Sequence, residues 1–490
     1  MNFAVIRNLL GKIMILVGLL MILPLSISII YLEGIRNILA FLIPICTMIV
    51  LGLIFNIKKP TENKILPREG LVIVGLSWLL LSLFGSIPFI ISKEIPHFVD
   101  AFFEISSGFT TTGASILGAS IKIESLSHSM LFWRSFSHWI GGMGILVFIL
   151  AIIPESKEGS SMHILRAESP GPTVGKLVSR VRVTSRILYL IYIGFTILEF
   201  LLLYLGPDAK MDAFSSLLYT FGTAGTGGFG VTGTSLTYYT RYSQYVISFF
   251  MIIFSINFTI YYLLLIGNFK EVIKNEELYV YLGIILISVG IIFANIYSLY
   301  HNFERTFREA LFQTTSIIST TGYVTVDYDA TWPVMAKSVL VILMFFGAMA
   351  GSTGGAIKIS RIIALFKSSI RKISNIINPR KVKVIYVNGK KMDDDAIEGV
   401  QSFFIVYLLV FVLCSLLIGI DGFDIITNIT ASLSCISNVG PGLGAVGPAG
   451  NFAGYSYFSK IILSIEMIAG RLELFPILVL FSPKTWAKNI

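Results

Sequence analysis

The sequence carries little charge for its length. Only 13% of its 490 residues are Asp, Glu, Lys or Arg, whereas a soluble domain carries about one quarter. In their place, 55% of the residues are hydrophobic, and the mean hydropathy is +0.81. This composition excludes an ordinary soluble protein and indicates a chain that lies in a membrane.

The sequence also has few groups suited to metal, redox or hydrolytic chemistry. Its three cysteines, Cys46, Cys414 and Cys435, lie in apolar surroundings without CxxC spacing, so we expect buried thiols and neither a disulfide framework nor a metal site. No Ser/His/Asp set and no carboxylate pair lies in register. The glycine-rich stretch at 347–358 is followed by no Gly-Lys-Ser/Thr, which excludes a phosphate loop. An enzyme is therefore the least favoured class.

Apolar runs close to the ~20 residues that cross a bilayer recur along the whole chain. The first follows Arg7 and Lys12 but has no small-residue cleavage site, which favours a retained helix over a signal peptide. We predict ten crossings, at about 12–31, 37–56, 70–92, 129–153, 185–205, 241–266, 279–299, 334–364 (interrupted), 401–420 and 458–482.

The distribution of Lys and Arg predicts how these crossings are oriented. The segment from Lys358 to Lys391 holds ten basic residues and no acidic one, and connections 93–100 and 206–212 are short with mixed or acidic charge. Further basic residues occur at Lys157, Arg166, Lys176, Arg180 and Arg182 and at Lys58, Lys59, Lys64 and Arg68. The rule that basic loops stay inside places both termini in the cytoplasm. The net charge of +9 is thus mostly a topology signal; it suits anionic lipid or a partner protein, and we expect no nucleic-acid partner.

A glycine-containing stretch occurs four times, each time after a short amphipathic segment and before a crossing. The four stretches are FTTTGAS (109–115), GTGGFGV (225–231), STTGYVT (319–325) and SNVGPGL (437–443), and they align on Gly113, Gly228, Gly322 and Gly440. The preceding segments, such as DAFFEISSGF and DAFSSLLYTF, are too short to span a bilayer. We therefore predict four repeats with re-entrant half-helices.

Four such units can build an ion filter. Non-helical backbone at membrane depth must be buried in protein or line an aqueous path, and a ring of carbonyl oxygens can replace the hydration shell of a monovalent cation. Glycine permits the positive φ that such a loop needs. The alternative is that these are ordinary loops at helix ends, but their fourfold occurrence favours the filter. The predicted filter residues are Thr111, Thr112, Gly113, Thr226, Gly227, Gly228, Thr320, Thr321, Gly322, Asn438, Val439 and Gly440.

Over essentially its whole length the chain resembles the Trk/Ktr/HKT superfamily of potassium transporters, and within it the TrkH type. The resemblance rests on the four loops, on WIGGMGI (139–145), on AGSTGGAIK (350–358) and on GRLELFP (470–476). It implies an all-α polytopic membrane protein with four M1–P–M2 repeats around a central K⁺ pathway. It further implies a homodimer in a bacterial or archaeal inner membrane, bound on the cytosolic side by an RCK-type subunit that carries the nucleotide site. No organic cofactor is expected on this chain.

The predicted domain boundaries follow from the repeats. Residues 1–57 form two extra N-terminal crossings, and the pore repeats occupy 58–153, 154–266, 267–372 and 373–490. The last begins with KVKVIYVNGKKMDDD (381–395), whose Asn-Gly pair predicts a β-hairpin in the cytoplasm. Loop 2 has Gly227, and loop 4 has Asn438 and Val439, where the others have threonine. These departures predict weaker discrimination against Na⁺.

Two features of the sequence bear on gating. Four glycines interrupt the eighth crossing at 347–358, and each costs ~1 kcal/mol in a helix interior. In the family this segment acts as a movable barrier; the alternative is a kink for close helix packing. Arg471 lies within the last crossing, where it either raises a barrier to cations or pairs with Glu466 or another carboxylate. The predicted gate residues are Gly347, Gly351, Ser352, Thr353, Gly354, Gly355, Lys358 and Arg471.

Two classes of transport remain open on the sequence. A gated conduit would let K⁺ follow its own gradient, with a less selective Na⁺/K⁺ conduit as a variant. An ion-coupled symporter driven by protons or Na⁺ would need alternating access around a midplane site. The four repeats all have the same orientation in the chain, and this arrangement favours the conduit.

Overall fold

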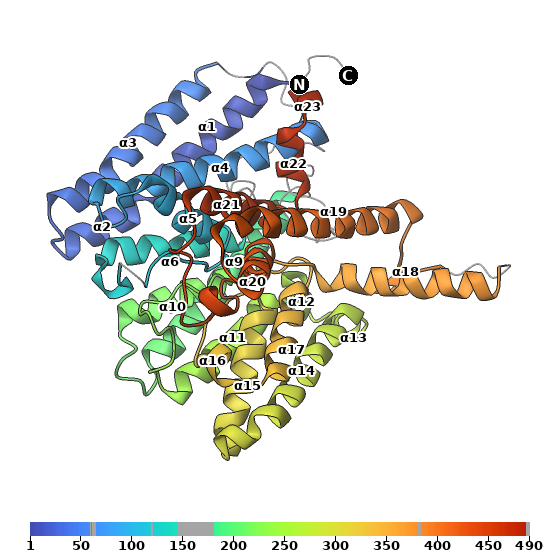
Figure 1. The fold of residues 1–490 in the computed structure, drawn as a ribbon. Coiled ribbons are helices and arrows are strands. Elements are labelled where there is room, and N and C mark those ends of the chain that lie inside the picture. The colour runs from blue at the N-terminus through green and yellow to red at the C-terminus, as the bar shows by residue number, and fades with distance from the viewer. Residues whose placement is uncertain (59, 61–64, 119–120, 145–180, 380–383, 487–490) are drawn as a thin grey trace.

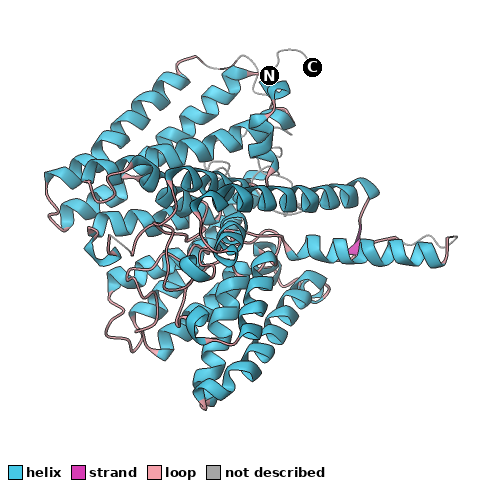
Figure 2. Ribbon diagram, viewed as in Figure 1, coloured by secondary structure: helices cyan, strands magenta, loops and turns pink. Residues whose placement is uncertain are grey.

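The computed structural model describes residues 1–490 apart from 59, 61–64, 119–120, 145–180, 380–383 and 487–490. The described chain is almost entirely helical (Figure 2). Within it, six helices are long and apolar enough to cross a membrane, or seven if one bent pair is counted, so ten crossings stays a prediction. The end of the predicted crossing 129–153 and most of the basic connection 154–184 lie outside the described residues, as do Lys59 and Lys64.

The N-terminal helices form a layer at one edge of the molecule (Figure 1). They are α1 (Phe3–Leu20), α2 (Ile22–Ile30), α3 (Ile35–Asn56) and α4 (Pro67–Ser92). α1 packs closely on α3, because a Cβ added at Gly11 would lie 2.8 Å from the Gly52 carbonyl oxygen. Cys46 on α3 is exposed while Cys414 and Cys435 are buried, so the expectation of three buried thiols was wrong for Cys46, which lies on the outer apolar face.

Four short helices run into the middle of the molecule. They are α5 (Phe98–Phe109), α10 (Ala213–Gly225), α15 (Phe303–Ile318) and α20 (Ile425–Ser437). Asp212, Asn302 and Asp424 cap the last three by accepting a hydrogen bond from the backbone N–H three residues later, which satisfies one of the free donors at a helix start. All four are almost wholly buried along their C-terminal halves.

Each short helix packs between the helix before it and the helix after it in the chain. The preceding helices are α4, α9 (Val181–Tyr204), α14 (Glu276–Tyr300) and α19 (Asp394–Ile418); the following ones are α6 (His128–Gly142), α11 (Arg241–Ser255), α17 (Val334–Phe345) and α21 (Tyr457–Arg471). The same local arrangement therefore occurs four times along the chain.

Three of the following helices are broken. The eighth predicted crossing is interrupted as expected, since α17 ends at Phe345 and α18 (Ile359–Ile377) begins after a loop. The predicted crossing at 241–266 divides into α11 and α12 (Phe258–Leu265), which meet at 90°. The predicted crossing at 458–482 also divides, because Glu473 and Leu474 have positive φ between α21 and α22 (Phe475–Phe481).

The predicted β-hairpin is confirmed for the residues that the structure describes, and its cytoplasmic location stays a prediction. β1 (Tyr386–Val387) pairs antiparallel with β2 (Lys390–Lys391), and Asn388 and Gly389 between them have φ of 51° and 72°, the conformation of a type I′ turn. The hairpin joins α18 to α19, which run side by side away from the remaining helices (Figure 1). The smaller helices are α13 (Phe269–Ile273), α16 (Tyr328–Thr331), α23 (Pro483–Trp486) and three 3₁₀ turns, Ile123–Ser125, Gly419–Asp421 and Gly444–Val446.

Candidate functional site

The four short helices end in loops with one backbone shape. The residue two places before each aligned glycine has positive φ, with 55° at Thr111 and Thr226, 61° at Thr320 and 55° at Asn438; the glycines have φ of 79°, 76°, 80° and 103°. In every loop the residue before the glycine donates its N–H to the carbonyl five residues earlier. A β-branched threonine in this region is strained, and such strain persists where the surroundings enforce it.

These loops contact one another in a closed ring. A Cβ added to Gly113, Gly228, Gly322 or Gly440 would lie under 3.0 Å from the carbonyl oxygen of Gly227, Thr321, Val439 or Thr112, respectively. Each glycine therefore faces the carbonyl that precedes the aligned glycine of the next loop, and the order 1–2–3–4–1 returns to its start. The negative ends of four helix dipoles converge on the same region.

One cavity of about 670 Å³ is lined by all four aligned glycines. Lys122, Glu124 and Asn451 also line it. Among the described residues no group of three or more His, Cys, Asp or Glu could hold a metal ion. At the four aligned loops themselves the oxygens are carbonyls and threonine hydroxyls, which suit a weakly held monovalent ion, and Glu124 adds a carboxylate to the cavity lining.

The interrupted segment between α17 and α18 lies directly against three of the loops. Gly355 donates its N–H to the Thr320 hydroxyl at 2.7 Å, and the Thr226 hydroxyl donates to the Thr353 carbonyl at 3.0 Å. A Cβ on Gly355 would lie 2.9 Å from that of Asn438. The segment therefore contacts the residue two places before the aligned glycine in loops 2, 3 and 4.

The bend between α11 and α12 holds this segment in place. Met349 donates its N–H to the Ser255 carbonyl at 3.1 Å, and Phe258 donates its N–H to the Gly351 carbonyl at 3.1 Å. Thr353 donates its hydroxyl to the Phe254 carbonyl at 3.0 Å. Breaking α11 thus frees the backbone groups that pair with the segment. This explains why residues 241–266, whose composition predicts one crossing, form two helices. The break lets the backbone amides of the neighbouring segment find hydrogen-bond acceptors, and unpaired amides inside a membrane are costly.

A buried carboxylate that the sequence did not single out ties the two ends of the segment together. One Glu277 oxygen accepts the N–H of Ala350 at 2.8 Å and of Ser360 at 3.0 Å. Glu277 is 1% exposed, and its own N–H donates to the Asn388 side chain in the β1–β2 hairpin at 3.0 Å. Lys358 donates to the Gly354 carbonyl within the segment.

Arg471 points at backbone carbonyls next to this segment. Its guanidinium donates to the Thr353 oxygen at 2.7 Å and to the oxygens of Gly141 and Gly142 at 2.6 Å each. The two nearby carboxylates have other partners. Glu466 accepts from the Ser432 hydroxyl at 2.6 Å, and Glu473 pairs with Arg361.

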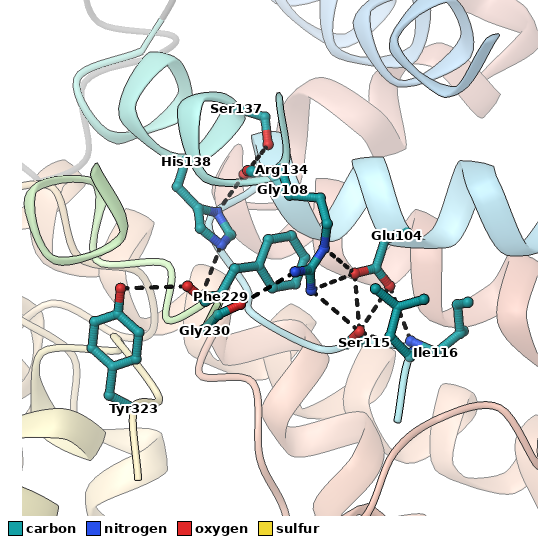
Figure 3. Close-up of polar contacts among 11 residues, drawn as sticks. Glu104, Gly108, Ser115, Ile116, Arg134, Ser137, His138, Phe229, Gly230 and Tyr323 are labelled. Carbon is teal, nitrogen blue, oxygen red and sulfur yellow. Dashed lines mark hydrogen bonds and ion pairs between the residues drawn. The ribbon is translucent and has the colours of Figure 1, made fainter. Parts of the chain in front are cut away.

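A buried polar cluster on α6 braces the first two loops (Figure 3). Arg134, 1% exposed, pairs with Glu104 at 2.8 Å, and its guanidinium lies 4.1 Å from the centre of the Phe229 ring. Glu104 also accepts from the Ser115 hydroxyl and from the Ile116 N–H at 3.0 Å. The residues just past Gly113 are thereby tied to those just past Gly228.

His138, one turn from Arg134, contacts its own repeat and the second one (Figure 3). Its Nδ1 lies 2.7 Å from the Gly108 carbonyl oxygen, and its Nε2 lies 3.3 Å from the Phe229 backbone nitrogen. His138 is fully buried. In the sequence, His138 stands out only through the letters FSHW, which run into WIGGMGI (139–145). The residues that His138 contacts are far away in the chain, so this motif alone could not reveal them.

The comparisons with known proteins agree with this arrangement. A family model described as TrkH, cation transport protein, matches residues 35–488. The chain belongs to the TrkH family. It is 35% identical over 500 residues to the Trk system potassium uptake protein TrkH of Escherichia coli, with 99% of this chain and 100% of that protein covered. It is 30% identical to TrkI of Halomonas elongata, with 99% and 97% covered.

A solved structure extends the TrkH-family likeness to three dimensions. The crystal structure of the potassium transporter TrkH from Vibrio parahaemolyticus matches with a TM-score of 0.87 and 30% identity, covering 99% of this chain and 100% of that chain. The relatives are transport proteins and not enzymes. As a TrkH-family member with long apolar helices, this chain is a membrane protein.

Proposed function

We propose that this chain takes up K⁺ across a cell membrane by gated, passive conduction through the four aligned loops. The observation that carries the proposal is the closed ring in which each aligned glycine faces a carbonyl of the next loop. The names of the relatives, Trk system potassium uptake proteins, support K⁺ as the ion. The carbonyls of the three residues ending at each glycine then replace the water around a dehydrated K⁺.

The segment from Gly347 to Lys358 acts as the gate, with Arg471 as its electrostatic lock. Support comes from its contacts with Thr226 and Thr320, which put it across the same centre as the ring. Arg471 donates to the Thr353 carbonyl, so its charge lies beside the ion path. A cation leaving the filter meets both a steric and a charge barrier, and the path opens when the segment moves away.

The remaining organisation follows the four repeats. We infer M1–P–M2 units over 58–153, 154–266, 267–372 and 373–490 with ten crossings, and both termini cytoplasmic in a bacterial or archaeal inner membrane. The chain forms a homodimer and binds an RCK-type nucleotide-binding subunit on its cytoplasmic face. The word "system" in the relatives' names supports additional components, and the basic residues of the hairpin, Lys390 and Lys391, offer a docking charge.

The test is ion flux through the purified chain in liposomes. We expect ⁸⁶Rb⁺ to enter down a K⁺ gradient, at a rate that an imposed proton or Na⁺ gradient does not change at fixed membrane voltage. Flux that requires either gradient would favour the symporter and contradict the conduit. Flux that is absent in a preparation that remains monodisperse, with and without its cytosolic partner, would contradict K⁺ conduction altogether.

Loop composition further predicts modest selectivity. Gly227 and Val439 leave two of the four loops without a hydroxyl at the position before the glycine. We expect K⁺ to be preferred over Na⁺ by a smaller ratio than in filters built from four TVGYG loops. Reversal potentials measured under mixed K⁺ and Na⁺ gradients give the ratio directly.

A further inference from the structure

The second loop lacks a side chain at a position where the other three have one. Immediately before the aligned glycine stand Thr112, Gly227, Thr321 and Val439. The three side chains are fully buried. The Thr112 hydroxyl lies 2.9 Å from the Asn438 amide nitrogen, and the Thr321 hydroxyl lies 2.7 Å from that of Ser319. In these loops a side chain fills the space behind the filter backbone.

In the second loop that space is filled by His138. A Cβ added to Gly227 would lie 2.2 Å from Cγ, 2.3 Å from Nδ1 and 2.6 Å from Cδ2 of the His138 imidazole. Real Cβ contacts are essentially never this short. The ring therefore occupies the volume that a side chain at 227 would need, and glycine stands there because His138 reaches in from α6.

The contacts of His138 fix its chemical form. Nδ1 faces the Gly108 carbonyl, which only accepts, and Nε2 faces the Phe229 N–H, which only donates. Both contacts are satisfied together only by a neutral imidazole with its proton on Nδ1. The ring thus joins the last turn of α5, in the first repeat, to the residue after Gly228 in the second.

The position of Phe229 makes this contact relevant to ion binding. The carbonyl of Gly228 belongs to the same peptide unit as the Phe229 N–H, so a hydrogen bond on that N–H fixes the direction of the Gly228 carbonyl. The Phe229 ring in turn lies 4.2 Å from the imidazole, centre to centre, and under the guanidinium of Arg134. The buried side chains of His138 and Arg134 thus fix the orientation of the peptide unit that joins Gly228 to Phe229.

We propose that His138 is the missing side chain of the second filter loop and a specificity-determining positioning residue for K⁺ over Na⁺. This inference rests on the proposed filter. His138 acts through the Gly227–Phe229 backbone and contacts no ion itself. Without it the second loop has neither a filled rear space nor a fixed Gly228 carbonyl. The loop can then close around the smaller Na⁺.

The experiment is a double-mutant cycle read out as the K⁺/Na⁺ permeability ratio in liposomes. We expect His138→Ala to lower the ratio about tenfold, because an amide loses its partner, and Gly227→Thr alone to abolish flux by collision with the ring. The double variant His138→Ala/Gly227→Thr regains flux and has a ratio above that of His138→Ala, since threonine takes the vacated space.

Two further variants separate the roles and guard against misfolding. His138→Phe retains a ring but offers no polar atom, so it lowers the ratio; His138→Gln, whose amide both donates and accepts, retains most of it. Ser135→Ala on the same helix is the matched control. An unchanged ratio in His138→Phe, or a double variant that carries no flux or has a ratio no higher than that of His138→Ala, overturns the proposal. If the unaltered chain carries no K⁺, the proposed function fails instead.

Discussion

Single backbone positions decide what the loops can do. Thr111, Thr226 and Thr320 are held at positive φ, which costs a β-branched residue of order 1–3 kcal/mol each. The cost is recovered by burial and by hydrogen bonds that recur in all four loops. The aligned glycine two residues later is needed for a different reason, because a side chain there would collide with a carbonyl of the next loop. We therefore expect a change at either position to act on the proposed filter before it acts on the fold.

The substitution Gly322→Ala should abolish K⁺ flux while the protein still assembles. Its Cβ would collide with the Val439 carbonyl oxygen, and Gly322 has φ of 80°. ⁸⁶Rb⁺ uptake by cells lacking other K⁺ uptake measures the effect. Gly283→Ala on α14 is the control, because nothing lies within 4 Å of the added Cβ, and it should leave uptake unchanged. Normal flux through monodisperse Gly322→Ala protein would contradict the close approach of loops 3 and 4.

Replacing Arg471 with alanine should raise basal K⁺ flux. The change removes a positive charge and the hydrogen bonds to the carbonyls of Thr353, Gly141 and Gly142. Arg471→Lys preserves the charge with fewer donors and should have an intermediate flux. Flux into liposomes without any cytosolic partner measures the closed-state leak. A folded alanine variant with an unchanged leak would assign Arg471 to packing alone.

At the scale of elements, broken helices build the proposed gate. The 90° bend between α11 and α12 and the interruption between α17 and α18 supply one another's backbone partners. Neither break could stand alone in a membrane, because its unpaired amides would find no water. Glu277, at the start of α14, holds both ends of the interruption and contacts the β1–β2 hairpin through Asn388. Movement of the hairpin therefore bears directly on the proposed gate.

Removing the Glu277 carboxylate should loosen the gate. In Glu277→Ala the N–H groups of Ala350 and Ser360 lose their shared acceptor, so we expect a higher basal flux and faster exchange of both amides with deuterium. Glu277→Gln keeps one acceptor oxygen and should change both quantities less. Glu276→Gln, next in the chain and paired with Lys367, is the matched control. Equal exchange in all four proteins would exclude a restraining role for Glu277.

Across the whole molecule, both described chain ends lie at the same edge (Figure 1). This is the arrangement expected if both termini lie in the cytoplasm, as the basic segments predict. The paired helices α18 and α19 project with the hairpin at their junction, and the hairpin's lysines are exposed. The exposed lysines of the hairpin are the docking charge that we propose for a cytosolic partner.

Both termini should be accessible from one side of the membrane. Tags placed at the two ends should be digested together by protease in inside-out vesicles and survive together in intact cells. A tag within the connection 206–212 should behave in the opposite way. Digestion of only one terminal tag in inside-out vesicles would imply an odd number of crossings.

The sequence alone determined the membrane class, the four aligned loops, the interruption at 347–358 and the Asn-Gly hairpin. Each depends on composition or on residues that are neighbours in the chain, where backbone preferences and hydropathy act locally. Tertiary structure decided which groups meet. Arg471 contacts a carbonyl 118 residues away, and Glu277 an amide 73 residues away. His138 excludes a side chain at Gly227, and α11 bends where a distant segment forms hydrogen bonds with its carbonyls. Burial and hydrogen bonding between residues so far apart in the chain leave no signal in the local sequence.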